Sequence, residues 1–423
     1  MKKTLLYIAL IIVLCISILY WSLSSTNKIF QKSELVNIDN VDDINFKKYD
    51  SVWVAASTLY EADVIKKAMQ GEHYREAWAT AIKAPVLFLD TLFGGVEIIK
   101  EGGGRQTHSL KLKAPNGTLY TLRSINKDPE DLIPEFTTTL GLENIVVDGI
   151  SAQHPYGAIY AAQLSKSAHI LHTNPKIVFL PKQKKLKSYN DKYGNRLFLL
   201  EYETEGPVNW TSLKNIIELI DTKNLQRLKL EYKNRLQINK KELIKVRLFD
   251  FLIGDWDRHT KQWGWAIQKQ DTNFVAIPVA GDRDNAFFNT QGIIPSLLSN
   301  EHVVPELRPF KEEIDFIEGL VYPFDRYFLL NTSETLFVSE AQALQALISD
   351  AVIDNALSVW PKQISAIDGK EITTKIKHRR DDLVKYAKAF KKEIDMQGAV
   401  TADLKGSGKL DLDPEFIRCF ECY

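Results

Sequence analysis

Polar side chains that can hold a cation and move a proton are concentrated in two short segments of the chain. The first, residues 255–262, follows an apolar run and combines two carboxylates with a guanidinium, an imidazole and an amide. Its members are Asp255, Asp257, Arg258, His259 and Gln262. The second, residues 281–285, follows the apolar stretch 274–279 and reads Gly-Asp-Arg-Asp-Asn. Carboxylate and amide oxygens bind hard cations, and a carboxylate can accept a proton, so the two segments predict one polar site.

A third segment, upstream of these two, has residues suited to binding a phosphate group. Gly102, Gly103 and Gly104 separate two expected strands, and glycines allow backbone amides to approach a phosphate closely. Arg123 and Lys127 are four residues apart on the next expected strand, so they point to one face and either could neutralise the phosphate. A plain turn and two solvated cations would explain each feature separately. The order of the three segments is the stronger indication.

The apolar patterns around these segments predict an α+β chain with two lobes. Short, partly alternating strands are expected at 96–99, 110–113, 120–125, 177–180 and 197–202. Helices are expected within 62–82, at 154–172 and, from residue 212 onward, over most of the chain, including 225–251. We therefore expect a small antiparallel β-rich lobe, a hinge near 203–207 and a larger helical lobe. A cleft between two lobes is a usual place for a ligand.

The composition narrows the class of protein. The 423 residues include 54 basic and 54 acidic side chains, so the formal net charge is zero and nothing supports nucleic-acid binding. A hydrophobic share of 45% and a charged share of 26% are those of a globular chain, with a length of roughly two to three domain-sized units. Because the chain has only 3 cysteines, neither a disulfide framework nor a cysteine-rich zinc module is expected.

An apolar run at residues 5–23 follows Lys2 and Lys3. At 1.5 Å per residue it would span roughly 28 Å, close to the thickness of a bilayer core. It is longer than the roughly 7–15 residues of a typical signal-peptide core, and the lysines favour a cytoplasmic N-terminus. We expect a single-pass anchor in the inner membrane with the remainder outside the cytoplasm. Small residues at 22, 24 and 25 leave signal cleavage, and a secreted or periplasmic chain, as the alternative.

These features divide the chain into five parts. They are an anchor at 1–24, a polar linker at 25–50, the first lobe with its preceding helices at 51–205, the helical lobe at 206–396 and a tail at 397–423. Cys419 and Cys422 lie in the tail without the βαβ context of a thioredoxin-like redox motif. A local disulfide in an oxidising compartment, or simple exposure, is the expected state of this pair.

The order of the segments resembles the protein-kinase-like superfamily, particularly its atypical branch of phosphoinositide kinases, HipA-type kinases and secretory-pathway kinases. The resemblance covers about residues 96–380. Residues 257–259, Asp-Arg-His, match the catalytic loop of the phosphoinositide and secretory branches, which implies that Asp257 receives the proton of the acceptor hydroxyl. Gln262 stands where the phosphoinositide kinases have a metal-binding Asn. It keeps the carbonyl ligand but is one methylene longer.

Other family roles fall on residues of both lobes. Asp284, which precedes Asn285, resembles the family's later metal-binding Asp, and Asp282 is the weaker match. The turn at 102–104 resembles the phosphate-covering loop, and Lys127 or Arg123 the phosphate-contacting base. Glu201 resembles the segment that borders the adenine. For the helix-borne Glu of protein kinases, Glu135 or Gln163 could stand in.

Four stretches, at 71–78, 102–110, 172–175 and 254–259, are also similar to a bacterial envelope family of kinase-like domains. The resemblance to the kinase-like superfamily implies ATP and Mg²⁺ or Mn²⁺ as cofactors, and we expect an envelope protein, lipid or glycan hydroxyl as the acceptor. Because the site departs from the family pattern at Gln262, a catalytically inactive module that binds nucleotide or protein is the alternative function.

Two hydrolase classes fit the sequence less well. Asp257 and His259 satisfy the first metal-binding element of calcineurin-like phosphoesterases, but their Gly-Asn-His element is missing. With 8 histidines in the chain and no downstream run of them, a two-metal hydrolase lacks ligands. The Gly-x-Ser-x-Gly elbow of many serine hydrolases is absent as well.

Overall fold

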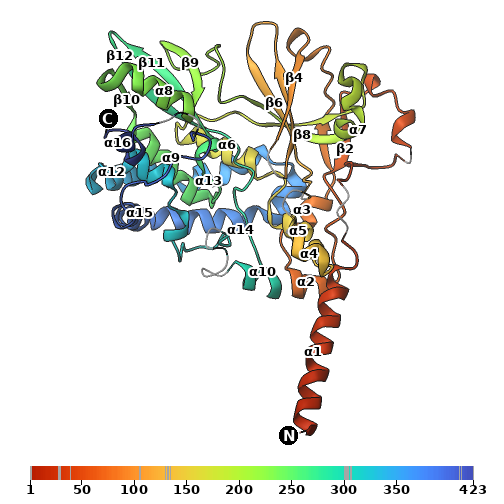
Figure 1. Ribbon diagram of the computed structural model, residues 1–423. Coiled ribbons are helices and arrows are strands. Elements are labelled where there is room, and N and C mark those ends of the chain that lie inside the picture. Colours follow the sequence, from red (N-terminus) through yellow and green to blue (C-terminus); the bar gives the residue numbers. More distant parts are fainter. Residues whose placement is uncertain are drawn as a thin grey trace.

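The chain folds into two lobes, from which one long helix projects (Figure 1). The computed structural model describes residues 2–26, 30–38, 40–103, 106–128, 130, 133, 135–299, 304, 307–408, 410 and 412–422, without the side chain of residue 136. The expected arrangement, a small antiparallel sheet followed by a larger, mainly helical lobe, is confirmed.

The strands form three sheets in the described part of the chain. The small first sheet consists of β1 (Glu34–Leu35), β2 (Ser51–Ala55) and β3 (Ile82–Pro85). The main sheet of the first lobe has the order β4 (Glu97–Gly103), β5 (His108–Lys113), β6 (Leu119–Ser124), β8 (Arg196–Tyr202) and β7 (Lys176–Leu180). The second lobe contains a sheet of order β10 (Leu236–Ile238), β12 (Asn273–Ala280), β11 (Trp263–Gln270) and β9 (Ile216–Asp221).

Helices surround these sheets. In the first lobe they are α2 (Val64–Gln70), α3 (Arg75–Ala79), α4 (Glu135–Thr139), α5 (Glu143–Gly149), α6 (Gly157–Ser167) and α7 (Asn190–Tyr193). In the second lobe they are α8 (Thr222–Tyr232), α9 (Lys240–Ile253), α10 (Ile293–Leu298), α11 (Pro323–Leu329), α12 (Glu334–Leu347), α13 (Asp350–Ala356), α14 (Lys362–Asp381), α15 (Leu383–Gln397) and α16 (Pro414–Arg418). The projecting helix is α1 (Lys2–Leu23).

The main sheet of the first lobe forms because its strands alternate between two apolar environments. On β8, Phe198 and Leu200 face a core that belongs to this lobe, whereas Leu197 and Leu199 face the larger core shared with the helices. Successive side chains of a strand point to opposite faces, so both faces of the sheet are covered. All five expected strands are present, and the turn at 115–117 between β5 and β6 closes with a hydrogen bond from the Gly117 amide to the Ala114 carbonyl (2.9 Å).

The stretch expected as a polar linker, 25–50, packs against the first lobe over part of its length. Strand β1 pairs with β2, and Phe46 is buried in the main core. The Ser33 hydroxyl lies 3.1 Å from Oδ1 of Asn126. Short apolar contacts of this kind lack a sustained period, which is why the sequence pattern did not indicate them.

One expected helix is interrupted. Residues 225–251 form α8, β10 and α9 rather than continuous helix. The backbone turns at Lys233, where φ is 49°, and α9 begins at Asn239, whose side chain caps the amide of Glu242 (3.2 Å). Between them, Leu236 and Ile238 are buried and Gln237 is exposed, the alternation of a strand.

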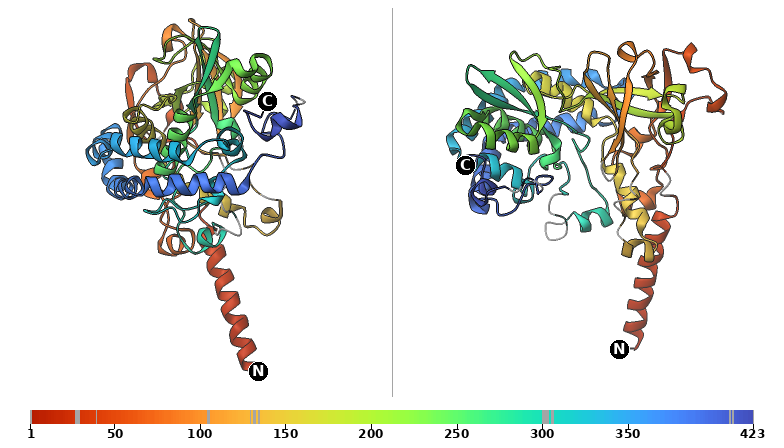
Figure 2. Two further views of the ribbon diagram at one scale, coloured as in Figure 1. Left: turned by 90° about the vertical axis from the view of Figure 1, so that its left-hand side faces the viewer. Right: turned by 45° about the horizontal axis from the view of Figure 1, so that its top comes forward.

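Helix α1 is the described helix that is long and apolar enough to cross a membrane as a single element. Most of its side chains are exposed, and Figure 2 shows it projecting from the lower end of the first lobe. A signal sequence near an N-terminus can also be long and apolar enough to meet this criterion. The expected apolar helix is thus present, as an anchor or as a signal.

The C-terminal tail packs on the second lobe. Phe416 and Phe420 are buried beside Tyr327. Cys419 and Cys422 form a disulfide, the local pairing that was one of the two expected states.

Candidate functional site

The two polar segments of the second lobe meet because a β-hairpin joins them. Strands β11 and β12 are antiparallel, and Trp263 at the start of β11 pairs with Ala280 at the end of β12. The segment before β11 therefore lies beside the segment after β12. The Gly281 amide donates to the Gln262 carbonyl (3.1 Å) and extends this pairing by one step. The hairpin thus places 255–262, which we call the catalytic-loop segment after the family loop that its sequence resembles, next to 281–285.

Helix α9 ends where the catalytic-loop segment begins. Gly254 adopts a left-handed conformation with φ of 66°, and its amide donates to the carbonyl of Asp250. A Cβ at this position would lie 2.5 Å from the ring of Phe310, so a larger residue would clash. Glycine is favoured here for both reasons.

Arg258 holds the catalytic-loop segment against the hairpin. Its guanidinium donates from Nη1 to the carbonyl oxygen of Gly281 (2.9 Å) and lies 4.6 Å from the centre of the Trp263 ring. The side chain is fully buried. Because one side chain contacts both segments, Arg258 fixes their relative position.

Beneath the loop lies a cluster of buried charges that we call the support network. Its members are Arg247, Asp250, Asp255, Arg258, Arg283 and Asp325. Asp250 is at its centre: Oδ2 is 3.0 Å from Nη1 of Arg247 and 3.1 Å from Nε of Arg258, and Oδ1 is 3.0 Å from Nη2 of Arg283. Buried charges need such partners, since unpaired ones are strongly destabilising.

Asp255 is the member of the support network with the weakest pairing. Its Oδ1 accepts the amide of Asp257 (3.3 Å), and its Oδ2 is 3.6 Å from the guanidinium of Arg258. Burial raises the pKa of Asp255 well above its ordinary value. This carboxyl therefore favours its protonated form.

Asp257 is partly exposed near the start of the catalytic-loop segment. Its Oδ2 lies 3.4 Å from the amide nitrogen of Gln262, and its Oδ1 is 3.7 Å from Nε2 of His259. The imidazole of His259 accepts the amide of Lys261 (3.2 Å), and burial lowers its pKa. Asp257 is thus a carboxylate with an amide and an imidazole as neighbours.

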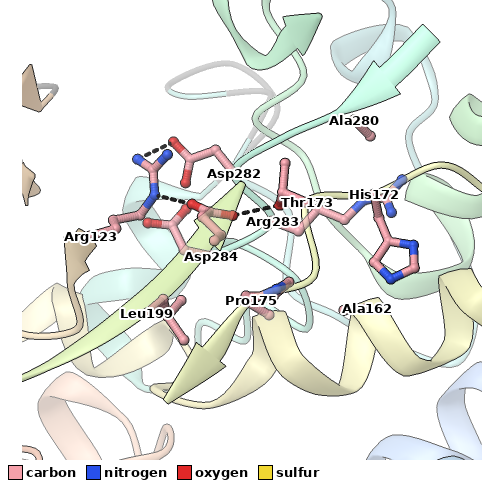
Figure 3. Close-up of a pocket in the computed structure, with 12 residues that line it drawn as sticks. Arg123, Ala162, His172, Thr173, Pro175, Leu199, Ala280, Asp282, Arg283 and Asp284 are labelled. Carbon is pink, nitrogen blue, oxygen red and sulfur yellow. Dashed lines mark hydrogen bonds and ion pairs between the residues drawn. The ribbon is translucent and has the colours of Figure 1, made fainter. Parts of the chain in front are cut away.

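Two cations of the first lobe contact two carboxylates of segment 281–285. On β6, Arg123 donates from Nη1 to Asp282 (2.9 Å) and from Nε to Glu201 on β8 (3.0 Å). Lys127, just beyond β6, pairs with Asp284 and donates to the hydroxyl of Thr107 (2.9 Å). Figure 3 shows Arg123, Asp282 and Asp284 grouped around one pocket. We call these groups, Arg123, Lys127, Glu201, Asp282 and Asp284, the cleft network.

The two carboxyls of segment 281–285 differ in their protonation. Burial raises the pKa of Asp282 to about 7, with a further contribution from the charge of Asp284 and opposition from Arg123. Burial would also raise the pKa of Asp284, but the charges of Lys127 and Arg123 outweigh it and lower this pKa below its ordinary value. Asp284 is therefore ionised, and Asp282 titrates near neutrality.

The described part of the glycine turn at 102–104 lies next to the cleft network. Gly102 and Gly103 end β4, and Gly104 lies outside the described residues. Gly103 has φ of 128°, and a Cβ there would lie 2.0 Å from the carbonyl oxygen of Thr107, so only glycine fits. Because the hydroxyl of Thr107 accepts from Lys127, the turn and the cleft network are in contact.

Most of the residues that the sequence indicated are therefore brought together. Arg123, Lys127, Glu201 and Asp284 share the cleft network. The side chain of Glu201 is hydrogen-bonded by Thr173 (2.6 Å) as well as by Arg123, so it faces the cleft carboxylates. Its role beside an adenine stays a prediction.

The pair formed by Asp257 and Gln262 is separate from the cleft network. Among the described side chains, Gln262 is hydrogen-bonded to Asp257 and not to Asp284. The hairpin connects the two groups through the backbone, as the contact between Gly281 and Gln262 shows. Glu135 and Gln163, which could replace the helix-borne Glu of protein kinases, lie on α4 and α6. The described partners of Lys127 are Asp284 and Thr107.

Asp282, the weaker sequence match to a metal-binding Asp, lines the same pocket as Asp284. Asp250 was not indicated by the sequence analysis. Asp250 and Arg247 did leave a signal: they are charged residues within the apolar helix stretch 243–253, where such residues must find buried partners.

The described residues contain no group of three or more His, Cys, Asp and Glu side chains arranged to hold a metal ion. The cleft network instead offers two adjacent carboxyls. One oxygen, Oδ1 of Asp282, is buried and has no hydrogen-bond partner. The network also has three carboxyls, those of Glu201, Asp282 and Asp284, against two basic side chains. This donor set suits a cation that takes its remaining ligands from elsewhere.

No protein-family model matches the chain, and no curated protein matches it. Solved structures similar to it include the proinflammatory kinase CtkA of Helicobacter pylori, with 16% identity, a TM-score of 0.38, and coverage of 70% of this chain and 96% of CtkA. Another is a chain of the HipA–HipB toxin–antitoxin complex with operator DNA from Shewanella oneidensis MR-1. Its identity is 12% and its TM-score 0.36, and the match covers 70% of this chain and 67% of that one.

Scores this low carry no inference about what the chain does. The chain's own elements occur in the order that the sequence resemblance implies: the glycine turn between β4 and β5, the basic residues on and after β6, the Asp257 loop and the carboxylates after β12. The structure brings the glycine turn, the basic residues and these carboxylates into contact, and the hairpin places the Asp257 loop beside them.

Proposed function

We propose that the chain is a membrane-anchored phosphotransferase that transfers a phosphoryl group from ATP to a hydroxyl of an envelope acceptor outside the cytoplasm. The observation that carries this proposal is the cleft network. Cations of the first lobe, Arg123 and Lys127, meet Asp282 and Asp284 at one end of the hairpin that also carries Asp257. Phosphoryl transfer depends on such positioning and electrostatics.

The cleft network fits a metal-bound nucleotide. Mg²⁺ is usually held in proteins by one or two carboxylates together with substrate phosphates. Mg²⁺ or Mn²⁺ would be held by Asp284, Asp282 and the side-chain carbonyl oxygen of Gln262. The phosphates would face Gly102, Gly103, Lys127 and Arg123. When bound, the metal and nucleotide supply the phosphoryl group and neutralise its charge.

Each side chain then has a defined task. Lys127 and Arg123 now neutralise carboxylates, and they can exchange these partners for phosphate oxygens of the same charge. Asp257 orients the acceptor hydroxyl and takes its proton at a carboxylate oxygen. Arg258 acts as a positioning residue, since it holds the loop of Asp257 against Gly281.

Two features support a location outside the cytoplasm. Lys2 and Lys3 precede the apolar helix α1, a pattern that favours a cytoplasmic N-terminus and a translocated remainder. The disulfide between Cys419 and Cys422 suits an oxidising compartment. Within the envelope, the acceptor would be the hydroxyl of a protein, a lipid or a glycan.

Nucleotide binding is tested first, by thermal unfolding of the full chain with MgATP and MnATP. Ligand at about 100 times its dissociation constant stabilises a protein by about 2.7 kcal/mol, which for a chain of this size is a shift of a few degrees. The shift should be lost in Asp284→Ala and kept in Asp403→Ala, a change at an exposed carboxylate of the tail. A shift of equal size in Asp284→Ala would remove this residue from the nucleotide site.

Phosphoryl transfer is tested with Asp257→Asn, which keeps the shape of the side chain and removes its basicity. We expect transfer of labelled phosphate from ATP, to the chain itself or to an envelope extract, to fall by about 10²–10⁴-fold. Nucleotide-dependent stabilisation should be unchanged. Asp271→Asn, at the exposed tip of the hairpin, is the matched control. Undiminished transfer by Asp257→Asn would contradict the proposed role.

A second function, a nucleotide-binding module without catalysis, is favoured by one observation. Gln262 replaces the Asn of related kinases, and its amide lies 3.4 Å from Asp257 instead of contacting Asp284. Gln262→Asn distinguishes the two functions. A phosphotransferase should keep or gain activity in this variant, whereas an inactive module should show nucleotide stabilisation and no transfer in either form.

A further inference from the structure

Helix α1 is joined tightly to the first lobe. Ser22 and Leu23 at its end are buried. The side-chain amide of Gln70 on α2 donates to the Ser22 hydroxyl (3.0 Å), and Asn144 on α5 donates to the Thr26 carbonyl (2.7 Å). The last turn of the apolar helix therefore packs on α2 and α5. If α1 spans a bilayer, the surface around this junction lies at the level of the lipid headgroups.

Helix α2 beside the junction turns two polar side chains inward, and its outer face combines apolar side chains with Lys67, which pairs with the exposed Glu72 (2.8 Å). Lys66 and Gln70 are 2% and 1% exposed, and Lys66 pairs with the buried Asp148 (3.1 Å). On the outer side, Val64 is 83% exposed and Ile65 is 37% exposed. A helix on a water-facing surface has the opposite pattern. The outer face of α2 thus suits an apolar surrounding.

A second short helix presents apolar side chains at the same level. Helix α10 contacts α2, and the backbones approach so closely that a Cβ on Gly292 would lie 2.3 Å from the Gly71 amide nitrogen. Its Ile293, Leu297 and Leu298 are all exposed, Leu297 to 64%. Figures 1 and 2 show α10 and α2 at the end of the folded part from which α1 projects.

The aromatic residues of α1 mark where the membrane surface would lie. Tyr20 and Trp21 are exposed at the end of α1 that meets the lobe. Tyrosine and tryptophan are enriched at the interface between acyl chains and water. The Tyr20 hydroxyl donates to the carbonyl oxygen of Leu140 (2.5 Å), and the Leu140 side chain is exposed. Leu140 therefore lies at the same depth.

We propose that these apolar side chains form a collar around the exit of α1 that rests in the interfacial layer of the outer leaflet. The apolar collar consists of Val64, Ile65, Leu140, Ile293, Leu297 and Leu298. This inference rests on the anchor in the proposed function, because an uncleaved α1 brings the collar to the bilayer. The collar would fix the orientation of the lobes on the membrane, whereas a helix alone would leave them free to tilt.

A lipid surface fits the collar better than a second protein. The collar is continuous with α1, whose own exposed surface is apolar along most of its length. Its members come from three separate parts of the chain: α2 packs on the end of α1, Leu140 just after α4 is joined to Tyr20 of α1, and α10 packs on α2. Amphipathic segments in such a position bury their apolar face about 5–10 Å into the boundary between headgroups and acyl chains.

The test uses the full chain in vesicles of phosphatidylethanolamine and phosphatidylglycerol. Cys15→Ser removes the one free cysteine of the described residues, and Cys419 and Cys422 stay paired. A fluorophore is then attached at Leu297→Cys or, on a different element, at Val64→Cys. The matched control is Ile217→Cys, an exposed apolar position on β9, far from α1 (Figure 1). Quenching by lipid-borne and by aqueous quenchers is measured at each site.

We expect both collar labels to be quenched by the lipid-borne agent, at a depth of about 5–10 Å, and the control label by the aqueous agent. Collar labels that are as accessible to water as the control, on chains that float with the vesicles, would overturn the collar and leave the anchor intact. Labels protected from both agents would indicate a protein contact and would also overturn it. Chains that do not float would overturn the anchor and the collar together.

Discussion

The two charged clusters of this chain differ in where their members come from. The support network joins residues of the second lobe alone, and the exposed fraction of the Arg247, Asp250 and Asp325 side chains is 0% or 1%. The cleft network joins both lobes: Lys127 and Glu201 are 4% and 6% exposed, and the other three members are 16–18% exposed. The charges of the support network all belong to one lobe, although Arg283 also donates to Ser165 on α6 (2.6 Å), whereas the charges of the cleft network come from both lobes.

This difference separates structural charges from exchangeable ones. Breaking the support network means leaving arginines unpaired in a dry interior, so it remains intact while the lobe is folded. The cleft network can be replaced without unfolding, because a phosphate and a cation offer its members partners of the same charge. Whether a charge pair lies within one lobe or between the lobes therefore indicates a ligand site better than the strength of the pair does.

The largest effect on stability is expected from Asp250→Asn. It leaves three guanidinium groups with one fewer carboxylate, and breaking a buried pair in this way costs about 3–5 kcal/mol. Urea denaturation of the variant, compared with Asp271→Asn at the hairpin tip, measures the loss. A loss below about 1 kcal/mol would mean that the support network is not the rigid element described above.

A smaller loss is expected from Arg123→Gln in the cleft network. The variant removes hydrogen bonds to two carboxyls, which are worth about 1.5–3 kcal/mol, but Glu201 keeps Thr173 and Asp282 can take up a proton. It should also weaken nucleotide-dependent stabilisation. Arg235→Gln, at an exposed position, is the control for the change of charge. If the loss equals that of Asp250→Asn, the distinction between the two clusters fails.

The smallest effect is expected from Asp255→Asn, the neutral mimic of a carboxyl that burial keeps protonated. At pH 7 the variant should lose about 1 kcal/mol or less. Because the pKa of Asp255 is raised on folding, the wild type binds an extra proton when folded. Its stability relative to the variant should therefore fall as the pH rises from about 4, by at most about 1.4 kcal/mol per pH unit. A pH-independent difference would show that Asp255 is ionised.

The first lobe could be predicted from the sequence because its strands have local signals. The alternation at 197–200 identifies one strand, and the turn at 115–117 identifies two strands that pair with each other as neighbours in the chain. Strand β10 was not predicted, since three residues between two helices carry too little pattern. Its place depends on β12, which is almost forty residues further along the chain.

The members of the site could be predicted better than their partners. Residue types and order indicated Arg123, Lys127, Asp257 and Asp284. That Lys127 pairs with Asp284 depends on how the two lobes approach each other, which no local pattern records. Spacing likewise does not show that burial separates the pKa values of two carboxyls two residues apart.

The hairpin of β11 and β12 has a consequence for how this site can change its length without losing its geometry. Pairing runs from Trp263 and Ala280 at the base to Gln270 and Asn273 at the tip, and the tip is exposed. Removing the same number of residues from each strand near the tip keeps the base paired as before. A deletion of one residue from one strand alone shifts the register and turns every following side chain of that strand to the other face. The position of the catalytic-loop segment relative to segment 281–285 therefore depends on the register of the two strands and not on their length. Chains whose hairpins differ in length can carry the same site.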